Sequence, residues 1–62
     1  MTTKDYNIAN YALKSEYEAY DMYIDMIKAA DDPELKKVLK HNKKEEYEHI
    51  KLLMRAILKG LV

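Results

Sequence analysis

Hydrophobic residues recur along the 62-residue chain at alternating spacings of three and four, which is typical of helices that pack along one face. The only proline, Pro33, interrupts this pattern near the middle. Proline suits the first turn of a helix, and it disfavours helical geometry in the residue before it. The pattern therefore predicts one helix over about 4–30, a tight turn at 31–32 and a second helix over about 33–59, with no strand.

Residues typical of helix ends agree with these limits. The segment 2–5 resembles a capping box, and an aspartate before Pro33 can cap the second helix. Gly60 follows Lys59 at a position where a glycine C-cap is expected. We therefore expect a single all-α domain over 1–62, folded as an antiparallel two-helix hairpin.

Each predicted helix carries a first stripe in which polar residues interrupt hydrophobic and aromatic ones. In the first helix this stripe comprises Ala9, Leu13, Glu16, Tyr20, Tyr23, Ile27 and Ala30. In the second helix it comprises Leu35, Leu39, Asn42, Glu46, His49, Leu53 and Ala56. A carboxylate covered by a neighbouring helix is costly unless it is paired or bound to a metal, so these stripes indicate a polar site within the packed face.

A second stripe on each helix is almost entirely hydrophobic. It comprises Ala12, Ala19, Met22 and Met26 in the first helix, and Ile50, Met54, Ile57 and Leu61 in the second. Helices that are apolar on two sides are buried on two sides, and a lone hairpin cannot bury both. We therefore expect an obligate homodimer that completes a four-helix bundle, and then a larger ring.

Composition excludes several classes of function. The chain has no cysteine, which excludes disulfides, iron–sulfur clusters and thiolate zinc sites. Its 11 basic and 11 acidic residues give no net pull toward nucleic acid or a membrane surface. It also lacks an apolar segment of the ~20 residues that a membrane span needs, and its start lacks a secretory signal. We therefore expect a cytoplasmic protein stabilised by metal, by self-association or by both.

Glu16, Glu46 and His49 are the candidate metal ligands. Glu46 and His49 lie three residues apart, so both side chains can reach one ion from one face of a helix. Glu16 lies 15.5 residues before the turn centre at 31.5, and the midpoint of Glu46 and His49, at 47.5, lies 16 residues after it. In an antiparallel hairpin the three residues therefore stand at nearly the same height.

Two copies of the hairpin would supply four glutamates and two histidines, which is the ligand set of di-iron carboxylate bundles. Glu46 would bridge two metals, His49 would be a terminal nitrogen ligand, and Glu16 would chelate from the facing helix. This donor set suits Fe(II) or Mn(II), and Zn(II) is expected to bind in vitro without redox chemistry. The expected activity is a ferroxidase reaction, the oxidation of Fe(II) to Fe(III) by O₂ at two irons per dimer.

Other interpretations remain open at this point. A Glu-x-x-His pattern also arises by chance in a helix rich in Glu and Lys, which would leave a non-catalytic helical scaffold. A peroxide-consuming di-metal protein, similar to a rubrerythrin, is another alternative. Tyr20 and Tyr23 either pack through their rings or bond to a metal ligand, and His41 is either structural or a neighbour of the ligands. The lysines between 36 and 44 are interpreted as a solvated face.

The run from Leu39 to His49, with His-Asn, two residues and then Glu-Glu-x-Glu-His, resembles the second helix of the encapsulated ferritins. These proteins belong to the ferritin-like superfamily and are packed inside encapsulin nanocompartments. The segments 15–19 and 21–23 resemble the first helix of that family. The resemblance implies a ferritin-like bundle of two hairpins, a ring-shaped decamer, ferroxidase activity and delivery of iron to an encapsulin shell.

The resemblance also implies roles for individual residues. The family's iron ligands fall on Glu16, Glu46 and His49, and its tyrosine and histidine near the site fall on Tyr23 and His41. Of the acidic pair that forms an outer metal-binding site in the family, this chain keeps Glu18 but has Ser15 at the other position.

Overall fold

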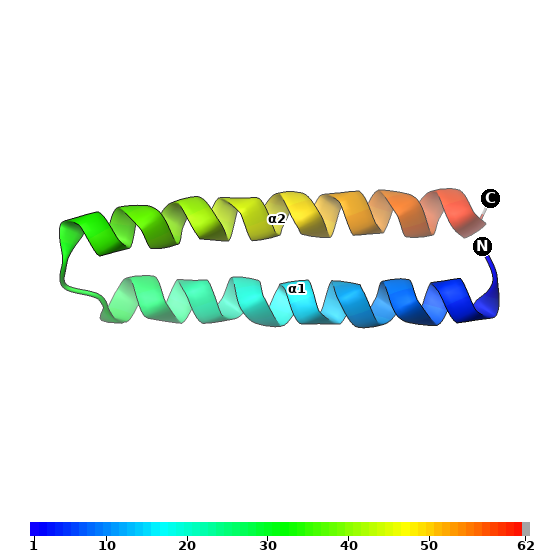
Figure 1. The fold of residues 1–62 in the computed structure, drawn as a ribbon, viewed down its shortest axis with the longest axis horizontal. Helices are drawn as coiled ribbons and strands as arrows, with labels where there is room; N and C mark the ends of the chain where they lie inside the picture. Colours follow the sequence, from blue (N-terminus) through cyan, green and yellow to red (C-terminus); the bar gives the residue numbers. More distant parts are fainter. Residues whose placement is uncertain (62) are drawn as a thin grey trace.

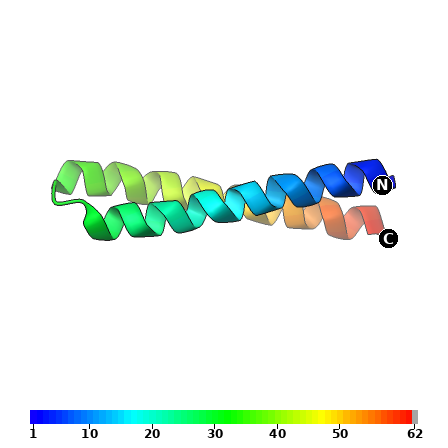
Figure 2. The same cartoon turned by 90° about the horizontal axis from the view of Figure 1, so that it is seen from below.

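The computed structural model describes the backbone of residues 1–61 and the side chains of residues 1–60. Helix α1 spans Thr3–Ala29 and helix α2 spans Pro33–Leu61. The two helices lie side by side and antiparallel, with both chain ends opposite the turn (Figure 1). They cross near the middle of their length, as the view along the other axis shows (Figure 2). The predicted all-α hairpin is therefore confirmed, and no strand occurs within residues 1–61.

Both helices begin at capping side chains. The backbone N–H of Asp5 donates to the hydroxyl oxygen of Thr2 at 3.0 Å. The backbone N–H of Leu35 donates to a carboxylate oxygen of Asp32 at 2.8 Å, directly before the proline that opens α2. These bonds satisfy N–H groups that have no partner inside a helix, which explains why the two helices begin where they do.

The expected C-cap at Gly60 is wrong. Helix α2 continues through Gly60 to Leu61, and no glycine has the positive φ of a left-handed cap. The reason is a contact with the chain start: the Met1 ammonium donates to the Gly60 carbonyl at 3.1 Å. A Cβ atom at Gly60 would lie 2.7 Å from the Met1 side chain, so glycine here makes room for a neighbour rather than turning the backbone.

The face of α2 that meets α1 differs from the predicted first stripe. Every residue of the first stripe predicted for the first helix is half-buried, as expected, including Ala30, which follows the end of α1. In α2, however, Leu35, His49 and Ala56 are exposed. Ile50, which was expected in the outward second stripe, is only 4% exposed and is the one buried hydrophobic residue among the described side chains.

Two alternative stripes on α2 explain why its packing face differs from the predicted one. Leu39, Glu46 and Leu53 belong to two possible packing stripes. Combined with residues 42, 49 and 56, or with residues 43, 50 and 57, they recur at alternating spacings of three and four. Isoleucine gains more from burial than histidine or alanine does. Helix α2 is therefore rotated so that Ile50 enters the contact and His49 stays at its edge.

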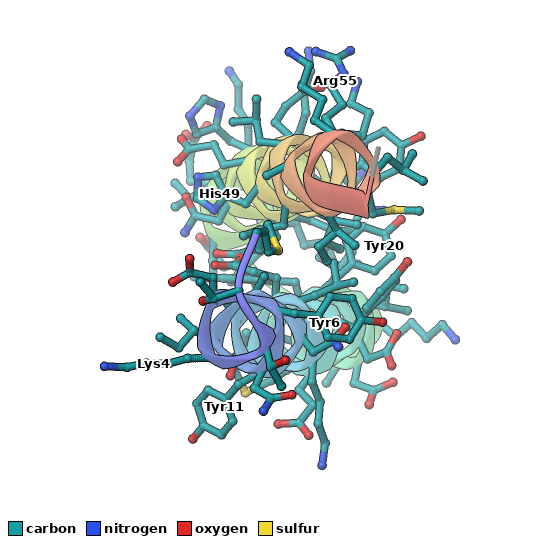
Figure 3. All side chains as sticks on the ribbon, turned by 90° about the vertical axis from the view of Figure 1, so that its right-hand side faces the viewer. Lys4, Tyr6, Tyr11, Tyr20, His49 and Arg55 are labelled. Atoms are coloured by element: carbon teal, nitrogen blue, oxygen red, sulfur yellow. The ribbon has the colours of Figure 1, made fainter. Side chains whose placement is uncertain are left out.

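The hairpin leaves two exposed sides, which differ in chemistry. His49 lies on one side of the helix pair, and Tyr6 and Tyr20 lie on the other (Figure 3). We call the first the carboxylate side, because Glu16 approaches His49 there. We call the second the tyrosine side, which also carries the contacting residues Tyr47 and Met54.

Candidate metal centre

The structure brings Glu16, Glu46 and His49 together at mid-length of the hairpin. Glu16 comes from α1, and Glu46 and His49 come from successive turns of α2. The Nδ1 atom of His49 lies 3.4 Å from a carboxylate oxygen of Glu16 across the two helices. One ligand atom from each residue lies within 4.8 Å of the others. The equal height predicted from distances to the turn is therefore confirmed.

Glu46 is the residue of this group with the least satisfied side chain. Its Oε2 atom is inaccessible to solvent and has no hydrogen-bond partner. His49 Nδ1 lies 3.7 Å from that oxygen, close enough to attract it electrostatically but too far for a hydrogen bond. A buried oxygen without a donor is costly, so the arrangement favours a cation at this point.

The electrostatics of the two carboxylates lead to the same conclusion. The pKa of Glu46 is raised above its ordinary value, mainly because its protonated form bonds to Glu16. Partial burial and repulsion from Glu16 raise the pKa further, and His49 offsets part of this effect. Without a cation, Glu46 therefore resists carrying a full negative charge beside Glu16.

The donor set fits a divalent metal such as iron or manganese. Two carboxylates and one imidazole are hard and borderline ligands, which these ions accept. The side chains of Glu46, Glu16 and His49 are 19%, 28% and 50% exposed, so the group is covered by the hairpin but opens at the carboxylate side. One copy of the chain could thus hold a metal with three residues and leave further coordination positions for other donors.

The two tyrosines proposed near the site, Tyr20 and Tyr23, both lie on α1, the helix that carries Glu16. Tyr20 lies on the tyrosine side (Figure 3), where its ring centroid is 6.3 Å from that of Tyr47. Tyr23 is half-buried on α1, two turns nearer the interhelical turn than Glu16. Within the described residues, neither hydroxyl forms a hydrogen bond with the three candidate ligands.

His41 and Glu18 are also placed away from the group in a single copy. The Nε2 atom of His41 lies 2.6 Å from a carboxylate oxygen of Glu45, and both side chains are more than half exposed. Glu18 is exposed on α1. Contacts of these two residues with the candidate ligands would therefore require another copy of the chain.

The contacts that order the tyrosine side were not predicted from the sequence. Tyr47 packs against Tyr20, and the Lys51 ammonium lies 5.1 Å from the centre of the Tyr47 ring. The hydroxyl of Tyr17 donates to the Met54 sulfur at 3.9 Å. The available signal was the helical phase of these residues, which places them together on the flank of the packed face away from His49.

Comparison with known proteins identifies the family. The model of the EncFtn-like family matches residues 1–59, which is nearly the whole chain. No curated protein and no solved structure gives a significant match. The resemblance to encapsulated ferritins is therefore confirmed at the level of the family. No segment of α1 or α2, as far as the structure describes them, combines the length and apolarity that a bilayer span requires.

Proposed function

Because the chain belongs to the EncFtn-like family, we propose that it is a ferroxidase whose two-iron site forms between two copies. Fe(II) is the substrate and O₂ is the electron acceptor. The observation that carries this proposal is the convergence of Glu16, Glu46 and His49 around a buried, unpartnered Glu46 oxygen.

The need for a second copy follows from the number and exposure of the ligands. One hairpin offers three ligand residues at an open side, where half of the His49 side chain is exposed. A second copy brought to this side would give four glutamates and two histidines, the set that holds two metals in di-iron bundles. Glu46, which combines the least exposed carboxylate with an unpartnered oxygen, is the proposed bridge between the ions.

Exposed hydrophobic residues around the site also favour a second copy of the chain as the partner. Helical geometry places Ile8 and Met22 of α1, and Val38 and Leu52 of α2, on the flank of each helix that lies away from Tyr20 and Tyr47. These four side chains are between 54% and 60% exposed. Covering them with a second hairpin would bury apolar area on both sides of the metal centre and exclude water from it.

Each residue has a defined task in the proposed reaction. Bound iron supplies the electrons that reduce O₂. Glu16 and Glu46 neutralise the charge of the ions and favour the more highly charged Fe(III). His49 fixes the position of one ion per copy from the α2 side. Mn(II) or Zn(II) is expected to occupy the same ligands in vitro, and Zn(II) should inhibit because it has no redox chemistry.

Assembly and location form a further part of the proposal. We infer from the family a ring of such dimers, a decamer, that passes Fe(III) to an encapsulin shell in the cytoplasm.

The test is Fe(II) oxidation by metal-free protein in air, followed by the absorbance of Fe(III). Glu46→Ala and His49→Ala are compared with Glu48→Ala, which removes an exposed glutamate of the same helix. We expect fast oxidation by the unmodified chain and by Glu48→Ala, and the rate of the buffer blank from the other two. Equal rates in all four samples and the blank would contradict the ferroxidase proposal and favour a non-catalytic helical scaffold.

A further inference from the structure

The tyrosine side contains a hollow that the proposed iron chemistry does not use. It has a volume of about 230 Å³ and is lined by Tyr20, Lys43, Lys44 and Tyr47. Tyr20 lies on the opposite side of the helix pair from His49 (Figure 3). The hollow is therefore separate from the candidate metal centre, although Tyr47 directly follows Glu46 in α2.

The polar groups at this hollow are hydrogen-bond donors of positive or neutral charge. The Lys43 ammonium lies 5.8 Å from the centre of the Tyr20 ring, and Lys43 is half-buried. The rings of Tyr20 and Tyr47 are tilted by 41° and form one wall. Two lysines and two tyrosines thus line a hollow that no acidic residue lines.

These donors lack acceptors in the protein. Across residues 1–60, neither Lys43 nor Lys44 forms an ion pair, whereas Lys51, nearby on the same helix, pairs with Glu48 at 3.1 Å. In the same part of the chain, the hydroxyls of Tyr20 and Tyr47 form no hydrogen bond, whereas Tyr17 donates to Met54. The phenol rings and lysine stems give the hollow an apolar floor, which strengthens the attraction for an anion.

We propose that this hollow binds a small tetrahedral oxyanion, with inorganic phosphate as the representative ligand. A phosphate dianion would balance the two lysine charges and accept hydrogen bonds from both hydroxyls. The volume suits a free ion rather than a large molecule. The site lies within one copy and needs no metal, so its existence does not depend on the proposed ferroxidase activity.

A phosphate ester carries the same anionic group as free phosphate and is the alternative ligand. The experiment distinguishes the ester from the free ion. The metal-free chain, labelled with ¹⁵N, is titrated with sodium phosphate at constant ionic strength, and in parallel with glycerol 3-phosphate and with sodium chloride. We expect saturable shifts of the amide signals of 43–47 with phosphate, at a Kd on the order of 1–10 mM for a half-exposed site. Shifts with the ester alone would overturn the proposal.

Matched variants then locate the site. Lys43→Gln/Lys44→Gln should weaken phosphate binding about tenfold, because it removes two charge-assisted hydrogen bonds. Lys36→Gln/Lys37→Gln removes the same charge from the same helix outside the hollow, and should change the Kd less than about twofold. Tyr47→Phe keeps the ring and should weaken binding about threefold. Equal weakening by both lysine pairs, or shifts that rise linearly without saturation, would overturn the proposal.

Discussion

Glu16, Glu46 and His49 on the carboxylate side approach one another and still leave a buried Glu46 oxygen without a donor. On the tyrosine side of the same two helices, Tyr20 and Tyr47 pack as rings, and Tyr17 bonds to a sulfur atom. The tyrosine side is therefore ordered by contacts within the protein, whereas the carboxylate side keeps an unpartnered oxygen that the proposed metal would satisfy. The comparison shows that a short hairpin can separate structural packing from a candidate metal site by helical phase alone.

Substitutions on the two sides should differ most in their effect on the rate of Fe(II) oxidation. Glu46→Ala, on the carboxylate side, should lower the rate at least about 100-fold, since the proposed bridge between the irons is lost. Tyr17→Phe removes a hydroxyl from the tyrosine side and should keep the unmodified rate. Stopped-flow absorbance measures both. A similar loss in the two variants would contradict the separation of roles.

Metal should stabilise the protein through the carboxylate side alone. At a Mn(II) concentration 100 times its Kd, the free energy of unfolding should rise by about 2.7 kcal/mol per site. Thermal unfolding at fixed protein concentration, with and without chelator, measures the shift. In Glu46→Ala the shift should fall to nearly zero, and in Tyr17→Phe it should persist. An equal shift in both variants would place the metal elsewhere.

Without metal, the raised pKa of Glu46 should make stability depend on pH. The folded protein holds the Glu46 proton more tightly than the unfolded chain does. This contribution is complete below the ordinary pKa of 4.5, and it is lost as the pH rises through the raised pKa. Glu46→Gln should therefore be more stable than the unmodified chain at pH 7, by about 1 kcal/mol.

This advantage of Glu46→Gln should shrink as the pH falls from above the raised pKa of Glu46 toward 4.5, because a protonated glutamate resembles glutamine. Chemical denaturation in the presence of chelator at several pH values measures the difference. Glu48→Gln, which changes an exposed carboxylate paired with Lys51, is the control. A Glu46→Gln difference that does not vary with pH would show that Glu46 is ionised as readily in the folded chain as in the unfolded one.

The smallest expected effect concerns packing on the tyrosine side. A double-mutant cycle with Tyr20→Leu and Tyr47→Leu should give a coupling of about 0.5–1 kcal/mol in the free energy of unfolding, which is typical of an aromatic pair. The control cycle combines Tyr20→Leu with Tyr11→Leu, since Tyr11 is 75% exposed and has no such contact. Equal coupling in the two cycles would mean that the ring pair does not order this side.

Most of the fold could be predicted from the sequence because its determinants are local. Pro33 fixed the start of α2, and the Thr2 and Asp32 caps follow short-range rules that hold in the structure. The equal height of Glu16 and His49 follows from counting residues on each side of the turn. Gly60 was misinterpreted because its role depends on Met1, at the other end of the chain.

The rotation of α2 could not be predicted in the same way. The sequence offers two packing lines that share Leu39, Glu46 and Leu53, and only the contact with α1 selects the one through Ile50. The same rotation sets how far His49 opens toward solvent and places Tyr47 against Tyr20. Hydrophobic periodicity identified the candidate ligands, but it could not show which residues of α2 are covered by α1 and which are exposed.

Anomalous diffraction at the iron absorption edge, from crystals grown with Fe(II), tests the central claim most directly. We predict two adjacent iron peaks between two copies of the chain, each within bonding distance of carboxylate and imidazole atoms of Glu16, Glu46 and His49. Iron bound only at exposed carboxylates such as Glu18 or Glu45, with no peak at the three converging residues, would contradict the account.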